Sequence, residues 1–332
     1  MEKKKKLYFL DNIRAFAILM VVLGHSIIIY SSQWSIYTTT NESSILSLLK
    51  QVINIFQMPL FFSLSGFLFY YSERKYGWLQ IIKGKLLRLG IPFLCFSFLW
   101  LFPIRMFVQY PGYKEISLVN IVISKILLGY DNGHMWYLPT LFICFVYSVV
   151  FSRLFKKVIK RELYFQLLNC SISGALYLIR FIVPVRAYID SFVSYYLWFA
   201  CGIFLAFLYN NYLELILRFA KYRFLLLVIT VLFVLVNILY NNFIIVLLAS
   251  FLCVVTIYCF IPNSQIKCLK LLSDNSFGLY LFHSPLCYIT FSFFPNAPIL
   301  FVVCINFLLF GFVSLYITMM MRKTKLKWLL GE

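Results

Sequence analysis

Acidic residues are the scarcest charged residues in this chain of 332 amino acids. Only 12% of its residues are charged, with 11 Asp and Glu against 30 Lys and Arg. A soluble domain of average composition carries about 25% charged residues. The chain therefore has too little polar surface to cover a water-soluble globule. Its 63% hydrophobic residues also exclude a disordered or collagen-like protein.

Cysteine motifs and metal-ligand spacings are absent as well. The nine Cys are scattered, none forms a CxxC pair, and most lie within apolar runs. This distribution is typical of packing residues and not of disulfides or metal sites. We therefore expect no metal cofactor. The sequence has no nucleic-acid-binding motif either, so the net charge of +19 needs another explanation.

The basic residues gather in short clusters between apolar runs. These clusters are Lys3–Lys6, 74–88, 153–161, 218–223, 267–270 and 322–327, whereas the alternate connections hold few Lys or Arg. Cytoplasmic loops of membrane proteins carry this excess, and a basic rim contacts anionic lipid. The pattern predicts a multi-pass membrane protein with both termini in the cytoplasm.

Ten apolar runs are long enough to cross a bilayer core of about 30 Å as helices. They are Leu7–Tyr30, Val52–Tyr71, Leu89–Val108, Met135–Phe151, Leu163–Ile182, Phe192–Tyr209, Phe224–Tyr240, Phe243–Ile261, Phe277–Phe294 and Ile299–Met321. Residues Ile116–Leu128 are apolar but shorter, which favours a helix at the membrane interface. The sequence predicts one all-α domain over residues 1–332, with no appended soluble domain.

Ionisable residues inside apolar runs are the candidates for function, because a charge at the centre of a membrane helix costs about 2.5–3.5 kcal/mol. Arg14 and His25 lie eleven residues apart on the first run, which places them on one helix face about 16–17 Å apart. Such a face suits a long anionic ligand. Alternatively, Arg14 extends to the interface beside Asp11, and His25 hydrogen-bonds a neighbouring helix.

Four segments are similar to the acyltransferase-3 family of bacterial membrane O-acyltransferases. They are the Arg-to-His helix (Leu10–Ala15 with Val21–Ser26), Gln57–Phe67, His134–Leu138 and Ser276–His283. The resemblance implies transfer of an acyl group, usually acetyl from acetyl-CoA, to a hydroxyl of a cell-envelope sugar. The acceptor would be a polysaccharide or a lipid-linked glycan, and polysaccharide-synthesis machinery is a possible partner.

Under this resemblance His25 is the base or acyl relay, since histidine accepts protons near neutral pH. Arg14 would bind the donor, because guanidinium groups match oxyanions, and Asp11 would restrain Arg14. No carboxylate lies deep in a run, so an acidic partner for His25 has to come from Glu115, Asp131 or Asp190.

The remaining candidates have two interpretations each. Ser65 lies beside Gly66 and either permits close helix packing or lines the donor channel. Trp136 is either an aromatic residue of the membrane interface or, with His134, a rim that stacks on a sugar. His283 lies shortly after the cytoplasmic entry of its span and either lines the donor cavity or makes a structural hydrogen bond.

Two other functions fit the same helices. One is a transporter or flippase of a polysaccharide or its lipid-linked precursor. The other is a non-catalytic subunit of a polysaccharide synthase. Loss of glycan acylation alone would favour the enzyme, and loss of the surface glycan itself would favour either rival.

Overall fold

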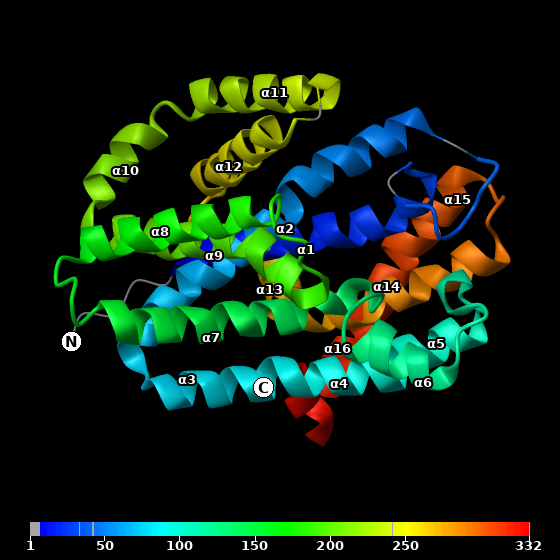
Figure 1. Ribbon diagram of the computed structural model, residues 1–332. Coiled ribbons are helices and arrows are strands. Elements are labelled where there is room, and N and C mark those ends of the chain that lie inside the picture. Colours follow the sequence, from blue (N-terminus) through cyan, green and yellow to red (C-terminus); the bar gives the residue numbers. More distant parts are fainter. Residues whose placement is uncertain (1–6, 33, 42, 241, 332) are drawn as a thin grey trace.

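The computed structural model describes residues 7–32, 34–41, 43–240 and 242–331 (Figure 1). Every regular element within these ranges is a helix, and no strand occurs among them. The predicted all-α class is therefore confirmed. The Lys3–Lys6 cluster lies outside the described residues, so the predicted position of the N-terminus stays a prediction.

The described α-helices follow the order of the chain. They are α1 (Tyr8–Ser26), α2 (Ser44–Lys75), α3 (Trp78–Lys85), α4 (Ile91–Phe96), α5 (Phe102–Phe107), α6 (Leu118–Asn120), α7 (Tyr137–Phe155), α8 (Glu162–Ile179), α9 (Ala187–Asn211), α10 (Leu213–Ala220), α11 (Arg223–Tyr240), α12 (Phe243–Phe260), α13 (Lys267–Asp274), α14 (Ser276–Phe293), α15 (Ile299–Cys304) and α16 (Phe310–Arg322). Short 3-10 segments cover Ile28–Tyr30, Pro111–Tyr113, Gly133–Trp136 and Lys325–Leu330, and π-helical segments cover Leu86–Gly90, Ser97–Leu101, Ile121–Leu127 and Ile305–Leu309.

Eight helices among the described residues are long and apolar enough to cross a membrane. They correspond to eight of the ten predicted spans: Tyr8–Ser26, Ser44–Lys75, Trp78–Phe107, Gly133–Phe155, Ala187–Asn211, Arg223–Tyr240, Phe243–Phe260 and Ile299–Arg322. The other two predicted spans coincide with α8 and α14, which are each 18 residues long but more polar. Most of α14 is buried inside the protein, so that helix does not need a lipid-compatible surface. The fold is that of a multi-pass membrane protein.

The third span begins earlier than the sequence predicts, at Trp78 in place of Leu89. Two π-helical segments interrupt it, and each stands just before a proline-containing turn, with Pro92 in α4 and Pro103 in α5. Proline has no N–H to donate to the preceding turn, and π-segments absorb such a lost hydrogen bond. Lys83 and Lys85 therefore lie on a helix and not in a loop.

Helices α2 and α9 pack closely at two glycines. A Cβ atom on Gly66 would lie 1.9 Å from the Phe199 carbonyl oxygen, and one on Gly202 would lie 1.9 Å from the Ser63 carbonyl oxygen. The two backbones are therefore in direct contact, as small residues in membrane helices permit. Gly66 therefore serves close helix packing, with Gly202 of α9 as its counterpart.

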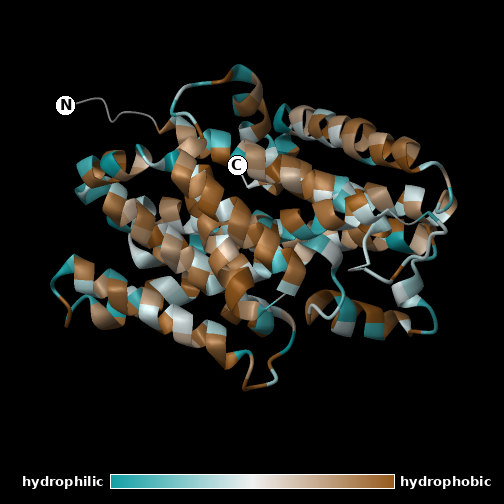
Figure 2. Cartoon of the chain, turned by 90° about the horizontal axis from the view of Figure 1, so that it is seen from above, coloured by the Kyte–Doolittle hydropathy of each residue, from teal (hydrophilic) through white to brown (hydrophobic). Residues whose placement is uncertain are grey.

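Helices α11 and α12 form a peripheral hairpin (Figure 1). Their contact includes a hydrogen bond between the hydroxyls of Thr230 and Thr256, 2.7 Å apart. Figure 2 shows hydrophobic residues along the lengths of the long helices and hydrophilic residues mainly at their connections. The segment Leu118–Leu127 is a short apolar helix, in agreement with the predicted length of the interfacial helix.

Candidate functional site

The three histidines of the chain converge at one place. His25 comes from α1, His134 from the 3-10 turn before α7, and His283 from the middle of α14. Their ring centroids are 5.2 Å apart for His25 and His283, 5.7 Å for His134 and His283, and 6.4 Å for His25 and His134. Because the sequence contains only three His, this cluster holds the entire imidazole content of the protein.

In His134 and His283, a backbone carbonyl determines which ring nitrogen carries the hydrogen. The Nδ1 atom of His283 lies 2.6 Å from the Leu279 carbonyl oxygen, and Nε2 of His134 lies 3.3 Å from that of Leu281. A carbonyl only accepts, so each of these nitrogens donates an N–H. The opposite nitrogens, Nε2 of His283 and Nδ1 of His134, are buried and have no hydrogen-bond partner among the described residues. In a neutral ring each of them presents a lone pair.

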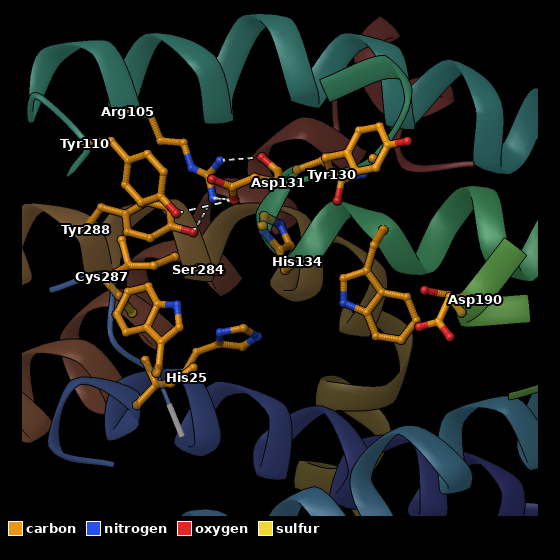
Figure 3. A pocket seen from close by; sticks show the side chains of 18 of the residues that line it. His25, Arg105, Tyr110, Tyr130, Asp131, His134, Asp190, Ser284, Cys287 and Tyr288 are labelled. Atoms are coloured by element: carbon orange, nitrogen blue, oxygen red, sulfur yellow. Dashed lines mark hydrogen bonds and ion pairs between the residues drawn. The ribbon is translucent and has the colours of Figure 1, made fainter. Parts of the chain in front are cut away.

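A cavity of about 500 Å³, called here the wide cavity, opens beside the histidines (Figure 3). Its lining includes His25, Trp34, Arg105, Tyr110, Asp131, His134, Trp136, Arg180, Asp190, Tyr195, Ser284 and Tyr288. Trp136 stacks on Tyr195 with 5.2 Å between ring centroids, and Tyr195 stacks on Phe62 at 5.0 Å. The wall of this cavity therefore combines polar groups with a layered aromatic surface.

A buried ion pair forms one wall of the wide cavity (Figure 3). Arg105 is 1% exposed, and its Nη2 lies 3.2 Å from Oδ1 of Asp131 and 2.9 Å from the Tyr288 hydroxyl. Its Nη1 donates to the Asp131 carbonyl oxygen at 2.8 Å. Burial raises the pKa of Tyr110, so its hydroxyl keeps the proton that it donates to Asp131 at 3.3 Å.

The ion pair also holds the turn that carries His134. Gly133 has φ +58°, and a Cβ there would lie 2.9 Å from Nη2 of Arg105. Only glycine accommodates that backbone without strain. The turn is fixed at its other end by Asn132, which donates to the Tyr188 hydroxyl at 2.7 Å, and Tyr280 donates to the His134 carbonyl oxygen at 2.6 Å.

A second cavity of about 220 Å³, the narrow cavity, extends from the histidines along α1. It is lined by Arg14, Val21, His25, Met58, Phe61, Leu64, Ser65, Leu68, Leu89, His134, Trp136, Tyr137, Leu141, Ser276, Phe277 and Tyr280. Arg14 and His25 thus line the same cavity, as their shared helix face predicts. His25, His134 and Trp136 line the wide cavity too, so the two cavities meet at these residues.

A third cavity of about 210 Å³, the basic cavity, continues in the same direction. It shares Ser65, Leu68, Leu89, Leu141 and Phe277 with the narrow cavity and adds Lys85, Arg88, Leu330 and Gly331. Lys85 Nζ lies 4.0 Å from the centre of the Phe145 ring. Three cavities in series therefore connect a cationic mouth with the aromatic wide cavity, and His25 lies at the narrow point between them.

Arg14 is held by two neighbours near the cationic mouth. Its Nη1 lies 3.7 Å from Oδ1 of Asp11 and 3.4 Å from the Ser273 hydroxyl. The predicted pairing of Arg14 with Asp11 is therefore present. Because the Arg14 side chain is 30% exposed and has further N–H groups, the guanidinium can still bind an anion in the cavity.

The structure shows where the residues with two interpretations lie. His283 lines none of these cavities and is completely buried, with the structural hydrogen bond to Leu279, yet it reaches His25. Trp136 borders both the wide and the narrow cavity. Asp131 is no partner for His25, because its carboxylate binds Arg105. Glu115 is exposed, whereas Asp190 does line the wide cavity.

The sequence alone does not predict a functional position for several residues. These are Arg105 with its partners Asp131 and Tyr288, the cavity cations Lys85 and Arg88, and Lys50. Arg105 stands out only as an ionisable residue at a span edge, and such a residue requires a carboxylate partner. Lys50 lies in α2 and is 4% exposed. A Cβ on Gly24 would lie 3.0 Å from its Nζ, so this ammonium approaches the helix turn of His25.

Within the described part of the chain, no group of three or more His, Cys, Asp or Glu has an arrangement that could hold a metal ion. The cations that line the narrow and basic cavities, and could bind an organic anion there, are Arg14, Lys85 and Arg88. Phosphates are natural ligands for such cations. The apolar section between these cations and His25 suits an uncharged extended arm.

Comparison with known proteins identifies relatives in bacteria. Residues 7–321 match the family described as "Acyltransferase domain". The protein is 30% identical over 156 residues to glucans biosynthesis protein C of Shigella dysenteriae serotype 1, and 30% identical over 158 residues to that of Escherichia coli K12. Each alignment covers 44% of this chain and 39% of the relative. No solved structure matches the chain.

Proposed function

The chain belongs to the acyltransferase-3 family, and from this premise we propose that it moves an acetyl group from acetyl-CoA to a hydroxyl of a cell-envelope glycan. The donor enters from the cytoplasm and the acceptor from the opposite side of the inner membrane. The relatives' name, glucans biosynthesis protein C, supports a carbohydrate acceptor. One observation carries the proposal: His25 borders both the narrow and the wide cavity.

The donor occupies the basic and narrow cavities. Lys85, Arg88 and Arg14 bind the phosphates of CoA, since cationic donors form short, charge-assisted hydrogen bonds with phosphate oxygens. The pantetheine arm extends along α1 past Phe61 and Leu64, and the thioester reaches His25. The axial separation of Arg14 and His25, about 16–17 Å on one helix, accommodates that arm.

His25 performs the proton transfer. A sugar hydroxyl is a weak nucleophile until a base removes its proton. His25 takes this proton while the hydroxyl oxygen attacks the thioester carbonyl carbon. The C–O bond forms, the C–S bond breaks, and the CoA sulfur receives the proton from His25. Alternatively, a His25 nitrogen attacks the thioester first: a C–N bond forms, the C–S bond breaks, and the CoA sulfur leaves with the imidazole proton. The sugar hydroxyl oxygen then attacks the acyl-imidazole, the C–N bond breaks, and the imidazole takes up the hydroxyl proton.

His283 is a positioning residue for His25. Its Nδ1–H is bound to the Leu279 carbonyl, so its Nε2 lone pair is left for an N–H of His25. His134 offers a second lone pair at Nδ1 in the same cluster. A catalytic histidine is usually oriented by a carboxylate; here the candidate Asp131 is bound to Arg105. Neutral imidazoles fill that role.

The acceptor sugar lies in the wide cavity. Trp34 and Trp136 line it from different elements, and aromatic faces pack well against the apolar faces of sugar rings. Asp190 and Ser284 supply hydrogen-bond acceptors and donors for sugar hydroxyls. Ser65, whose hydroxyl lies 3.3 Å from that of Tyr137, borders the donor side and not the acceptor side.

The direct test uses membrane vesicles that contain the protein, acetyl-labelled acetyl-CoA and the envelope glycan of a strain that lacks the gene. Transfer of label to the glycan, located by NMR as an O-acetyl ester, is the expected result. The His25→Ala protein, present at the same level, transfers none. A strain without the gene that makes no surface glycan at all would contradict the proposal and favour a flippase or synthase subunit.

A further inference from the structure

A fourth cavity lies beyond the C-terminal end of α1, the end away from Arg14, and the proposed reaction does not use it. It has a volume of about 580 Å³ and is enclosed by the connection between α1 and α2 together with the first turns of α2. We call it the hydroxyl groove. Its lining extends from Ile29 to Gln51, so a single stretch of chain builds it.

Hydroxyl groups dominate the described lining of this groove. Ten of its fourteen lining residues are Ser, Thr or Tyr, and none of the fourteen carries a charge. Such a surface offers many donors and acceptors without an ionic preference. A polyhydroxylated, uncharged ligand therefore matches it, whereas an anionic headgroup or a phosphate finds no cation among these residues.

One residue that lines the groove carries a hydroxyl with no hydrogen-bond partner among the described residues. Tyr30 is 3% exposed, and its buried hydroxyl makes no hydrogen bond. Leaving a buried polar group unsatisfied typically costs about 1–3 kcal/mol. This observation is independent of the composition of the groove, and a ligand hydroxyl would satisfy that group.

The groove is attached to the rest of the protein. Thr39 donates to the Pro295 carbonyl oxygen at 2.6 Å, and Asn41 Nδ2 donates to those of Asn296 and Ala297 at 3.0 Å and 2.9 Å. Tyr37 accepts a hydrogen bond from Ser292 at 2.8 Å. The connection therefore rests on the turn between α14 and α15, which fixes its shape.

Trp34 joins the groove to the site. It lines both the hydroxyl groove and the wide cavity. Its indole is held among aromatic rings, 5.6 Å from Tyr37, 6.4 Å from Tyr288 and 5.8 Å from Phe291 between centroids. A ligand chain that crosses Trp34 would therefore pass from the wide cavity to the groove.

We propose that the hydroxyl groove binds the uncharged sugar units next to the one that is acylated, so that the acceptor is a saccharide chain and not a free monosaccharide. This inference rests on the proposed acyl transfer to a glycan. The acylated unit lies in the wide cavity, the chain crosses Trp34, and the following units hydrogen-bond the groove. Acyl transfer should then depend on the length of the acceptor.

The test uses glycan from a strain that lacks the gene, cut into fragments of increasing length, and the intact membrane protein with labelled acetyl-CoA. For the wild type we expect kcat/KM to rise about tenfold, equivalent to about 1.4 kcal/mol, from the shortest fragment that is acylated to the long ones. The Tyr30→Phe and Thr38→Val variants keep the side-chain shape and remove one hydroxyl each. They should lose most of this rise and retain the wild-type rate on the shortest fragment.

The matched control is Ser124→Ala, which removes a hydroxyl of the π-helical segment after α6 that lines none of these four cavities. It should keep the full length dependence. The groove proposal would be overturned by equal rates on all fragments in the wild type, or by an unchanged length dependence in Tyr30→Phe. Either result would leave the proposed acyl transfer intact. Absence of transfer to every fragment would instead refute the proposed function, and the groove proposal with it.

Discussion

The imidazoles of His25 and His283 lie 5.2 Å apart between ring centroids, although they come from helices near opposite ends of the chain. Within the described part of the chain the His283 lone pair at Nε2 has no hydrogen-bond partner, whereas its Nδ1–H is held by the Leu279 carbonyl one turn earlier. Helices α1 and α14 therefore form one unit. The His283 ring is fixed by its hydrogen bond, and the His25 ring beside it lines both the wide and the narrow cavity.

Replacing His283 with Phe keeps an aromatic ring and removes the lone pair. If His283 orients His25, kcat should fall about a hundredfold, because correctly placed proton-transfer groups contribute about 10²–10⁴. KM for acetyl-CoA should stay near the wild-type value, since His283 lines none of the donor cavities. Steady-state kinetics with labelled acetyl-CoA measures both constants.

His283→Gln is the companion variant, because its amide oxygen restores an acceptor. It should recover part of the lost kcat. A purely structural role would instead lower the amount of folded protein in both variants and leave kcat per folded molecule unchanged. That result would refute the positioning role.

Arg14 variants test the donor site. Arg14→Ala should weaken acetyl-CoA binding roughly tenfold to hundredfold, because hydrogen bonds to a charged group are worth about 1.5–3 kcal/mol. Arg14→Lys keeps the charge but loses the planar arrangement of N–H donors. Its affinity for acetyl-CoA should therefore lie between those of the wild type and Arg14→Ala. Asp11→Asn removes the ion pair and should have a smaller effect. Calorimetric titration of the purified protein with acetyl-CoA gives each affinity. An affinity in Arg14→Ala equal to that of the wild type would contradict the assignment of Arg14 to the donor site.

Gly66 tests the contact of α2 with α9. Gly66→Ala places a Cβ 1.9 Å from a backbone oxygen of α9, so the helices must separate and the detergent-purified protein should unfold at a lower temperature. Gly174→Ala in α8 is the matched control, because a Cβ there meets nothing within 4 Å. It should be neutral or stabilising by up to about 1 kcal/mol. Equal unfolding temperatures for the two variants would refute the close contact.

Most of the fold could be predicted because hydropathy and length alone identify membrane helices. The exceptions have physical reasons. Lys83 and Lys85 lower the hydropathy of the residues before Leu89, although the helix continues through them from Trp78. Helix α14 is shielded by protein, so its composition is less apolar than that of a lipid-facing span. A hydropathy average over a stretch of sequence detects neither the continued helix before Leu89 nor the burial of α14.

The site was predictable only where one helix carries it. The spacing of Arg14 and His25 determines their common face without knowledge of other elements. The approach of His134 and His283 depends on how α7 and α14 pack against α1, and no periodicity encodes this. The pairing of Arg105 with Asp131 depends likewise on the path of the connection from α5 to α7.

That pairing makes a prediction about stability. Arg105→Met leaves the Asp131 carboxylate without its cation, and Asp131→Asn leaves a guanidinium that is 1% exposed without its anion. Removing one partner of a buried ion pair typically costs about 3–5 kcal/mol. Each single variant should therefore lower the thermal unfolding temperature of the purified protein clearly.

The double variant, Arg105→Met with Asp131→Asn, separates stability from function. Replacing both ions of a buried pair is often nearly neutral, so it should recover much of the unfolding temperature. It should not recover acyl transfer, because Arg105 also holds the Asp131 carbonyl and the Tyr288 hydroxyl and thereby fixes the turn before His134. Full activity in the stable double variant would show that the ion pair serves the fold alone. A double variant as unstable as the sum of the single ones would show that the two residues act independently.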